Sequence, residues 1–149
     1  MSKTAIVIPC HERDRRFLPA ALESTIGIPA EVHLLISDLP LTIALNCLIA
    51  GAIGTQYIVR LDADDRLCGP RAVGKAIAYL DSHSAAQLLY GSIPGFATQN
   101  PTGANTVFRR SLWAALGGYD ERLRHQEALD FEVRTRRLLP GGIVYLPFR

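Results

Sequence analysis

Three aspartates crowd one short stretch in the first half of the chain, and they are the residues best suited to chemistry. The stretch is Asp62-Ala63-Asp64-Asp65, and it follows the apolar run 57–61 directly. Like charges this close repel one another, so a chain keeps them together at least cost when a cation neutralises them. Hard divalent ions such as Mg²⁺ and Mn²⁺ prefer carboxylate and phosphate oxygens. The pattern favours a metal ion that holds a phosphate, with an ordinary polar surface turn as the alternative.

The composition is typical of one soluble globular domain. The chain has 149 residues, of which 48% are hydrophobic and 20% are charged, and this length buries a sizeable core. The net charge is only +2, so nucleic-acid binding is not indicated. The basic residues are fourteen Arg and two Lys. Arg forks bind phosphate and carboxylate groups, and codon bias explains the Arg excess equally well.

The cysteines predict neither a disulfide framework nor a zinc site. Cys10, Cys47 and Cys68 form no Cys-x-x-Cys pair and lie among apolar residues. We expect all three to be buried, reduced thiols, the usual state of cysteine in a cytoplasmic protein.

Two further features bear on localisation. Residues 1–4 lead straight into a strand-like run without the pattern of a signal peptide, so we expect a cytoplasmic protein. The uncharged segment 39–59 is long enough to cross a bilayer. Because Pro40, Gly51 and Gly54 interrupt it, we expect a buried helix followed by a strand instead.

The first half of the chain alternates apolar runs of strand and helix period. The pattern predicts strands at 4–9, 31–37 and 56–61 and helices at 17–26 and 41–53. This β-α-β-α-β order is typical of a doubly wound α/β sheet, mostly parallel, with right-handed crossovers. Ligands bind at the carboxyl ends of such strands, where this chain has Cys10-His11-Glu12, Asp38 and residues 62–65.

The second half is less regular. The pattern predicts helices at 72–81, 111–116 and 126–138, and strands at 87–90, 106–108 and 143–146. Residues 91–103 contain several Gly and Pro, so we expect a loop that lines or covers a site.

With these elements in order, the sequence resembles the family 2 glycosyltransferases of GT-A fold over nearly the whole chain. Residues 5–12 are similar to the family's opening strand and its Pro-x-(Tyr/His)-(Asn/Glu) turn. Leu45-Asn46 and residues 56–65 resemble its Arg-Asn helix and Asp-x-Asp-Asp strand end, the DXD motif. Residues 108–111 and 117–121 resemble its acceptor-side signature. The resemblance implies one compact GT-A (Rossmann-like) domain over 1–149, with a nucleotide-binding half at 1–65 and an acceptor-side half at 66–149.

Such a resemblance implies that a sugar is transferred, with inversion, from a nucleotide-diphosphate sugar to an acceptor hydroxyl. A UDP- or GDP-sugar is the implied donor, and Mn²⁺ or Mg²⁺ on Asp64 and Asp65 is the implied cofactor. A helix cap for Glu12 and an Asx turn for Asp38 are the structural alternatives. The implied donor-binding residues are Pro9, Cys10, His11, Glu12, Asp38, Asp62 and Asp64.

The inverting mechanism needs a carboxylate that takes the proton from the acceptor hydroxyl. The resemblance places this base shortly after the 117–121 turn, where the chain instead has Ala128. Asp130 aligns with the base when the register is shifted by two residues, and Glu127 shares a helix face with it. We take Asp130 as the catalytic base, with Glu127 as its substitute. A solvated helix face ion-paired with Arg134 is the structural alternative.

The sequence does not indicate the identity of the acceptor, and the chain is compact for this family. We expect acceptor recognition to rest on the 91–103 loop, on Asn105-Thr106, or on a protein or peripheral membrane partner. The alternative function is a degenerate, non-catalytic nucleotide-sugar-binding or partner-binding module. A nucleotidyltransferase would need a Gly-rich loop after the first strand, which the chain lacks. An Asp-x-Asp phosphatase would need a hydroxyl residue at position 66, where the chain has Arg66. An EF-hand would need Gly at position 67, where the chain has Leu67.

Overall fold

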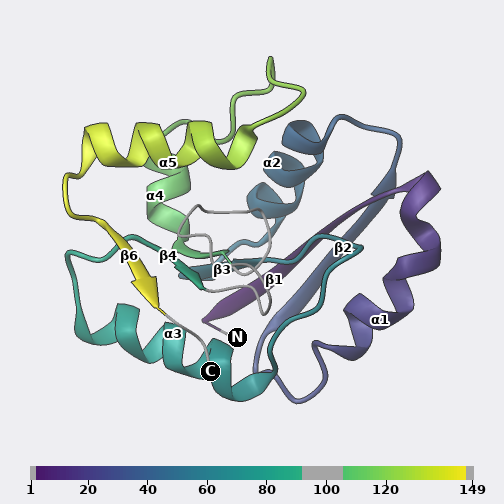
Figure 1. The fold of residues 1–149 in the computed structure, drawn as a ribbon, viewed down its shortest axis with the longest axis horizontal. Helices are drawn as coiled ribbons and strands as arrows, with labels where there is room; N and C mark the ends of the chain where they lie inside the picture. Colours follow the sequence, from purple (N-terminus) through teal and green to yellow (C-terminus); the bar gives the residue numbers. More distant parts are fainter. Residues whose placement is uncertain (1–2, 92–105, 147–149) are drawn as a thin grey trace.

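The computed structural model describes residues 3–91 and 106–146 (Figure 1). The predicted acceptor loop beyond Gly91 and the predicted contact at Asn105 therefore lie outside the described residues.

A six-stranded sheet in the order β2-β1-β3-β5-β4-β6 forms the centre of the fold. β1 pairs in parallel with β2 and β3, β5 runs antiparallel to β3 and β4, and β4 pairs in parallel with β6. The sheet is therefore mixed, with most pairings parallel, as the sequence pattern predicts. The strands are β1 (Thr4–His11), β2 (Glu31–Ser37), β3 (Tyr57–Arg60), β4 (Leu88–Gly91), β5 (Thr106–Arg109) and β6 (Ile143–Leu146).

Helices cover both faces of this sheet (Figure 1). Side chains of α1 and α3 share one apolar cluster with Ile6, Ile8 and Val59. Side chains of α2, α4 and α5 share the other with Val7 and Ile58. β1 lies between the two clusters, so its run from Thr4 to Cys10 is buried, as expected for a central strand. The helices are α1 (Leu18–Glu23), α2 (Leu41–Gly51), α3 (Pro70–Ser82), α4 (Arg110–Ala115) and α5 (Glu127–Leu138).

The predicted helix at 17–26 is shorter than its apolar spacing indicates. A 3₁₀ turn, η1 (Glu12–Phe17), precedes α1, and α1 ends at Glu23. The Ser24 and Thr25 hydroxyls then donate to the carbonyl oxygens of Ala21 and Leu22. These side chains satisfy carbonyls that a further helical turn would have used, so the helix stops earlier.

The prediction of three buried thiols is wrong for two of them. Cys10 is buried on β1, and burial raises the pKa of its thiol, so it is a poor nucleophile. Cys47 and Cys68 are exposed. Cys47 lies on the solvent side of α2, whose buried face is formed by Leu45, Leu48 and Ile49, and Cys68 lies in the connection to α3.

Within the described residues, no helix has the length and apolar character needed to cross a membrane. The uncharged run 39–59 contains α2 and the first three residues of β3, the helix and strand that its Pro and Gly residues predict.

Candidate active site

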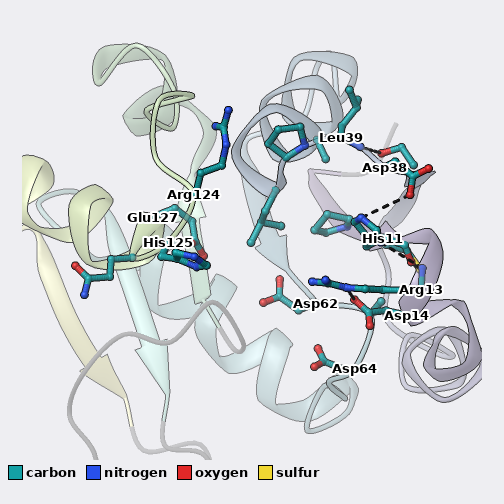
Figure 2. Close-up of a pocket in the computed structure, with 18 residues that line it drawn as sticks. His11, Arg13, Asp14, Asp38, Leu39, Asp62, Asp64, Arg124, His125 and Glu127 are labelled. Atoms are coloured by element: carbon teal, nitrogen blue, oxygen red, sulfur yellow. Dashed lines mark hydrogen bonds and ion pairs between the residues drawn. The ribbon is translucent and has the colours of Figure 1, made fainter.

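A cavity of about 470 Å³ opens where β1, β2 and β3 end, facing the segment that leads into α5 (Figure 2). The parallel pairing of these strands brings their carboxyl ends to one edge, which is why residues far apart in sequence meet there. Figure 2 shows His11, Arg13 and Asp38 on one side of the cavity and His125 and Glu127 on the other, with Asp62 and Asp64 between them.

The structure brings most of the predicted site residues together. Three lie elsewhere: Glu12 faces Arg15 on η1, with 3.5 Å between Oε2 and Nη1, and Asp65 and Asp130 do not line the cavity. The predicted residues that line it are Pro9, Cys10, His11, Asp38, Asp62, Asp64 and Glu127.

His11 connects the ends of β1 and β2. Its Nδ1 accepts a hydrogen bond from the Arg13 backbone N–H at 3.2 Å. A ring nitrogen that accepts carries no proton, so in the neutral ring the proton lies on Nε2. That nitrogen lies 3.5 Å from Asp38 Oδ1, and the Asp38 side chain is largely exposed. The pair therefore offers a carboxylate at the mouth of the cavity.

The aspartate cluster combines one paired carboxylate, one exposed carboxylate and one that carries its charge less easily. Asp62 accepts two hydrogen bonds from Arg60, at 2.8 Å from Nε and 3.0 Å from Nη2. Asp64 is exposed and lines the cavity. Burial, and then the charges of Asp62 and Asp64, raise the pKa of Asp65 to about 6. A cation at this turn would relieve that repulsion.

Arg60 is the site residue that sequence reasoning missed. It lies on β3 with 2% of its side chain exposed, and its Nη2 also donates to Glu127 Oε1 at 2.8 Å. Burial lowers the pKa of Arg60, but the charges of Asp62, Tyr119 and Glu127 and the hydrogen bonds to Asp62 together outweigh burial, so the pKa lies above its ordinary value. The signal was a single charged residue in an otherwise apolar strand, two positions before Asp62.

α5 presents its two candidate bases differently. It begins at Glu127, after Gln126, which adopts the left-handed conformation with a φ of 62°. Glu127 lines the cavity, whereas Asp130 accepts a 2.8 Å hydrogen bond from Arg134 Nε. Arg134 also donates from Nη1 to the carbonyls of Leu116 and Gly118, both at 3.0 Å. Asp130 thus belongs to the contact between α5 and the turn after α4.

Asn46 of α2 fixes that turn beside the site. Its Nδ2 donates to the Tyr119 carbonyl and to Glu121 Oε1, at 3.0 and 3.1 Å. Its Oδ1 accepts from Trp113 Nε1 and from the Tyr119 amide, at 3.0 and 2.9 Å. All the hydrogen-bonding capacity of this amide is used, so α2, α4 and the 117–121 turn form one unit.

The carboxylates of this cluster suit a metal ion that is bound together with a phosphate ligand. Among residues 3–91 and 106–146, no group of three or more His, Cys, Asp or Glu side chains is arranged to hold a metal. Mg²⁺ and comparable ions on nucleotide substrates use only one or two carboxylates, together with phosphate oxygens and water. The exposed Asp64 and the neighbouring Asp65, whose negative charge is disfavoured by burial and by the adjacent carboxylates, fit that requirement.

Comparison with known proteins identifies the fold. No protein-family model and no curated protein sequence matches the chain. Solved structures do match: S. aureus TarS in complex with UDP-GlcNAc has a TM-score of 0.77 at 12% identity over 100% of this chain. The mannosyltransferase PcManGT from Pyrobaculum calidifontis, in complex with GDP-Man and Mn²⁺, has a TM-score of 0.75 at 13% identity over 97% of this chain. The chain has the GT-A glycosyltransferase fold.

A third GT-A structure is similar over a comparable length. Glucosyl-3-phosphoglycerate synthase from Mycobacterium tuberculosis, in complex with Mn²⁺, UDP and glucosyl-3-phosphoglycerate, has a TM-score of 0.70 at 12% identity over 97% of this chain. The chain spans 57%, 55% and 69% of the TarS, mannosyltransferase and synthase chains. At these identities the likeness establishes the GT-A fold.

Proposed function

We propose that this chain is a metal-dependent, inverting glycosyltransferase that uses a nucleotide-diphosphate sugar, a UDP- or GDP-sugar, as its donor. The observation that carries the proposal is the cavity itself. The cavity lies at the carboxyl ends of β1, β2 and β3 of a GT-A fold. Its lining includes the carboxylates of Asp62 and Asp64 and a third carboxylate, Glu127, from α5. Residues 1–65 form the donor half and residues 66–149 the acceptor half.

The donor would lie along the ends of β1 and β2. His11 and Asp38, joined across 3.5 Å, offer polar atoms for the base and ribose. Arg13 points into the cavity, where its guanidinium suits a phosphate (Figure 2). Asp64 and Asp65 would hold Mn²⁺ or Mg²⁺, which would supply positive charge for the leaving diphosphate.

For the catalytic base we favour Glu127 over Asp130. Glu127 lines the cavity, and Arg60 binds its Oε1. Its Oε2 has no partner within residues 3–91 and 106–146, so it is available to accept the proton of an acceptor hydroxyl. Asp130 is already engaged by Arg134, outside the cavity.

One observation favours a second candidate, a nucleotide-sugar-binding module without activity. Ala128 occupies the position where the family resemblance implies the base. If no other carboxylate replaces it, the chain would bind donor and metal but would neither transfer nor hydrolyse the sugar.

The test is a thermal-shift panel of UDP and GDP with and without Mn²⁺, followed by measurement of nucleotide release from UDP- and GDP-sugars. A ligand at 100 times its Kd stabilises by about 2.7 kcal/mol, which raises the Tm of a domain of this size by about 5 to 10 °C. We expect that shift only when nucleotide and Mn²⁺ are both present, and we expect EDTA to remove it.

Asp64→Asn is the matched variant, because it keeps the side-chain shape and removes the charge. We expect it to lose the Mn²⁺-dependent shift and to retain the Tm of the free protein. Release of nucleotide by the wild type supports the enzyme, whereas a shift without any release supports the binding module. No shift with either nucleotide contradicts both proposals.

A further inference from the structure

A buried arginine at the centre of the sheet connects the two sides of the candidate site. Arg60 pairs in register with Val7 of β1 and Thr106 of β5, so it occupies a central position of the sheet. With 2% of its side chain exposed, Arg60 occupies a core position where an apolar residue would pack as well. Replacing buried ion pairs by apolar residues is often neutral or stabilising. Core stability alone therefore does not account for a guanidinium here.

The contacts of Arg60 show what it does supply. Its Nε and Nη2 bind the two oxygens of Asp62 at 2.8 and 3.0 Å, a bidentate fork. The same Nη2 binds Glu127 Oε1 at 2.8 Å, across 67 positions of sequence. One planar group thus fixes a carboxylate at the end of a strand and another at the start of a helix.

Aromatic packing holds the guanidinium in place. Its central carbon lies 6.0 Å from the centre of the Tyr119 ring, and Tyr119 stacks on Phe131 of α5 with ring centres 4.6 Å apart. Nη1 is buried and has no hydrogen-bond partner in the described parts of the chain. The fork is therefore directed by the two carboxylates, and its orientation is fixed from the side of α5 as well as from β3.

We propose that Arg60 is a positioning residue that holds Asp62 of the donor side and Glu127 of the acceptor side in one fixed arrangement. This inference rests on the proposed function and deepens it. Because Arg60 binds only Oε1 of Glu127, it directs Oε2 to the acceptor hydroxyl. The requirement is for the fork and not for a positive charge, since a Lys ammonium is a point charge that cannot bind Asp62 bidentately and reach Glu127 in the same plane.

The test compares Arg60→Lys with a control, Arg66→Lys. Arg66 also donates from Nη2 to a glutamate, at 2.9 Å to Glu23 Oε2, but neither residue lines the cavity. Two readouts are measured for both variants: hydrogen exchange of the amides 130–133 in the first turns of α5, and the steady-state rate of nucleotide release from the donor sugar.

For Arg60→Lys we expect amide exchange in 130–133 to rise at least about tenfold and kcat to fall about 100-fold, since a displacement of about 1 Å in a reacting group costs roughly that factor. We expect the donor KM to change less than about threefold, because the donor half keeps its other contacts. Arg66→Lys should leave kcat and this exchange unchanged. Unaltered kcat in Arg60→Lys, or equal losses in the two variants, overturns the inference.

The exchange readout keeps the inference separate from the proposed function. A wild type that releases no nucleotide from any UDP- or GDP-sugar counts against the enzyme. Faster exchange at 130–133 in Arg60→Lys alone still supports the positioning role, and unchanged exchange refutes it. If Arg60→Lys does not fold, Glu127→Ala removes the same contact from the other side: faster exchange supports the link, and wild-type exchange contradicts it.

Discussion

Adding one methyl group at Gly118 tests whether the Asn46 network holds the turn beside the site. Gly118 has a φ of +84°, and a Cβ there would lie 2.8 Å from Asn46 Oδ1. The neighbouring Gly117 has a φ of +73°, but a Cβ there meets no atom within 4 Å. The two glycines share the backbone penalty, and only Gly118 adds a clash with Asn46. Gly117→Ala is therefore the matched control for Gly118→Ala.

The magnitudes follow from these contacts. A non-glycine residue in the left-handed region costs about 1 to 2 kcal/mol, which we expect for Gly117→Ala. Asn46 cannot move aside without losing some of its four hydrogen bonds. Each is worth about 0.5 to 1.5 kcal/mol, so losing two adds about 1 to 3 kcal/mol for Gly118→Ala.

Urea unfolding measures the difference. At an m-value of about 1 to 3 kcal/mol/M, we expect the midpoint of Gly118→Ala to lie about 1 M below that of Gly117→Ala, with m unchanged. In an Asn46→Ala background the clash disappears, so the cost of Gly118→Ala should fall to that of Gly117→Ala. Equal midpoints for the two single variants would refute the role assigned to Asn46.

Two further predictions concern the choice of base and the pH dependence of stability. Glu127→Gln should lower the steady-state rate of nucleotide release by a factor of about 10² to 10⁴, the usual contribution of a general base. Asp130→Asn should change this rate by less than about threefold. A large loss in Asp130→Asn and a small one in Glu127→Gln would identify Asp130 as the base instead. The Tyr57 hydroxyl donates to Asp81 Oδ1 at 2.6 Å, and this hydrogen bond, with smaller contributions from Lys3, lowers the pKa of Asp81. A carboxyl group whose pKa is lowered by folding stabilises the fold at pH values above its ordinary pKa of 3.8. That stabilisation is lost as the pH falls below 3.8 and through the lowered pKa. The urea midpoint of wild type should therefore exceed that of Tyr57→Phe at pH 7, and the gap should narrow below about pH 4; a gap independent of pH would contradict the contact.

The sequence predicts the parts of the fold that depend on local pattern. The run at 4–9 is apolar on both faces, which only a central strand tolerates, and β1 is buried from Thr4 to Cys10. The strand at 31–37 matches β2 at both ends. The strand ends also locate His11, Asp38 and Asp64 at one edge, because parallel strands bring their carboxyl ends together.

The parts that depend on distant contacts were not predictable in this way. Glu127 and Asp130 look equivalent on one helix face, and the choice between them depends on which arginine each one meets in the fold. The partner of Glu127 is Arg60, 67 positions away, and no local period signals that pairing. The exposure of Cys47 likewise follows from how α2 is rotated on the sheet, a tertiary property.

The most direct measurement is a crystal structure of the protein with Mn²⁺ and UDP or GDP. We expect electron density for the nucleotide at the ends of β1 and β2 beside His11 and Asp38, with the ion between its diphosphate and Asp64. Nucleotide density at any other surface, or an ion bound without contact to Asp64 or Asp65, would contradict the assignment of this cavity as the donor site.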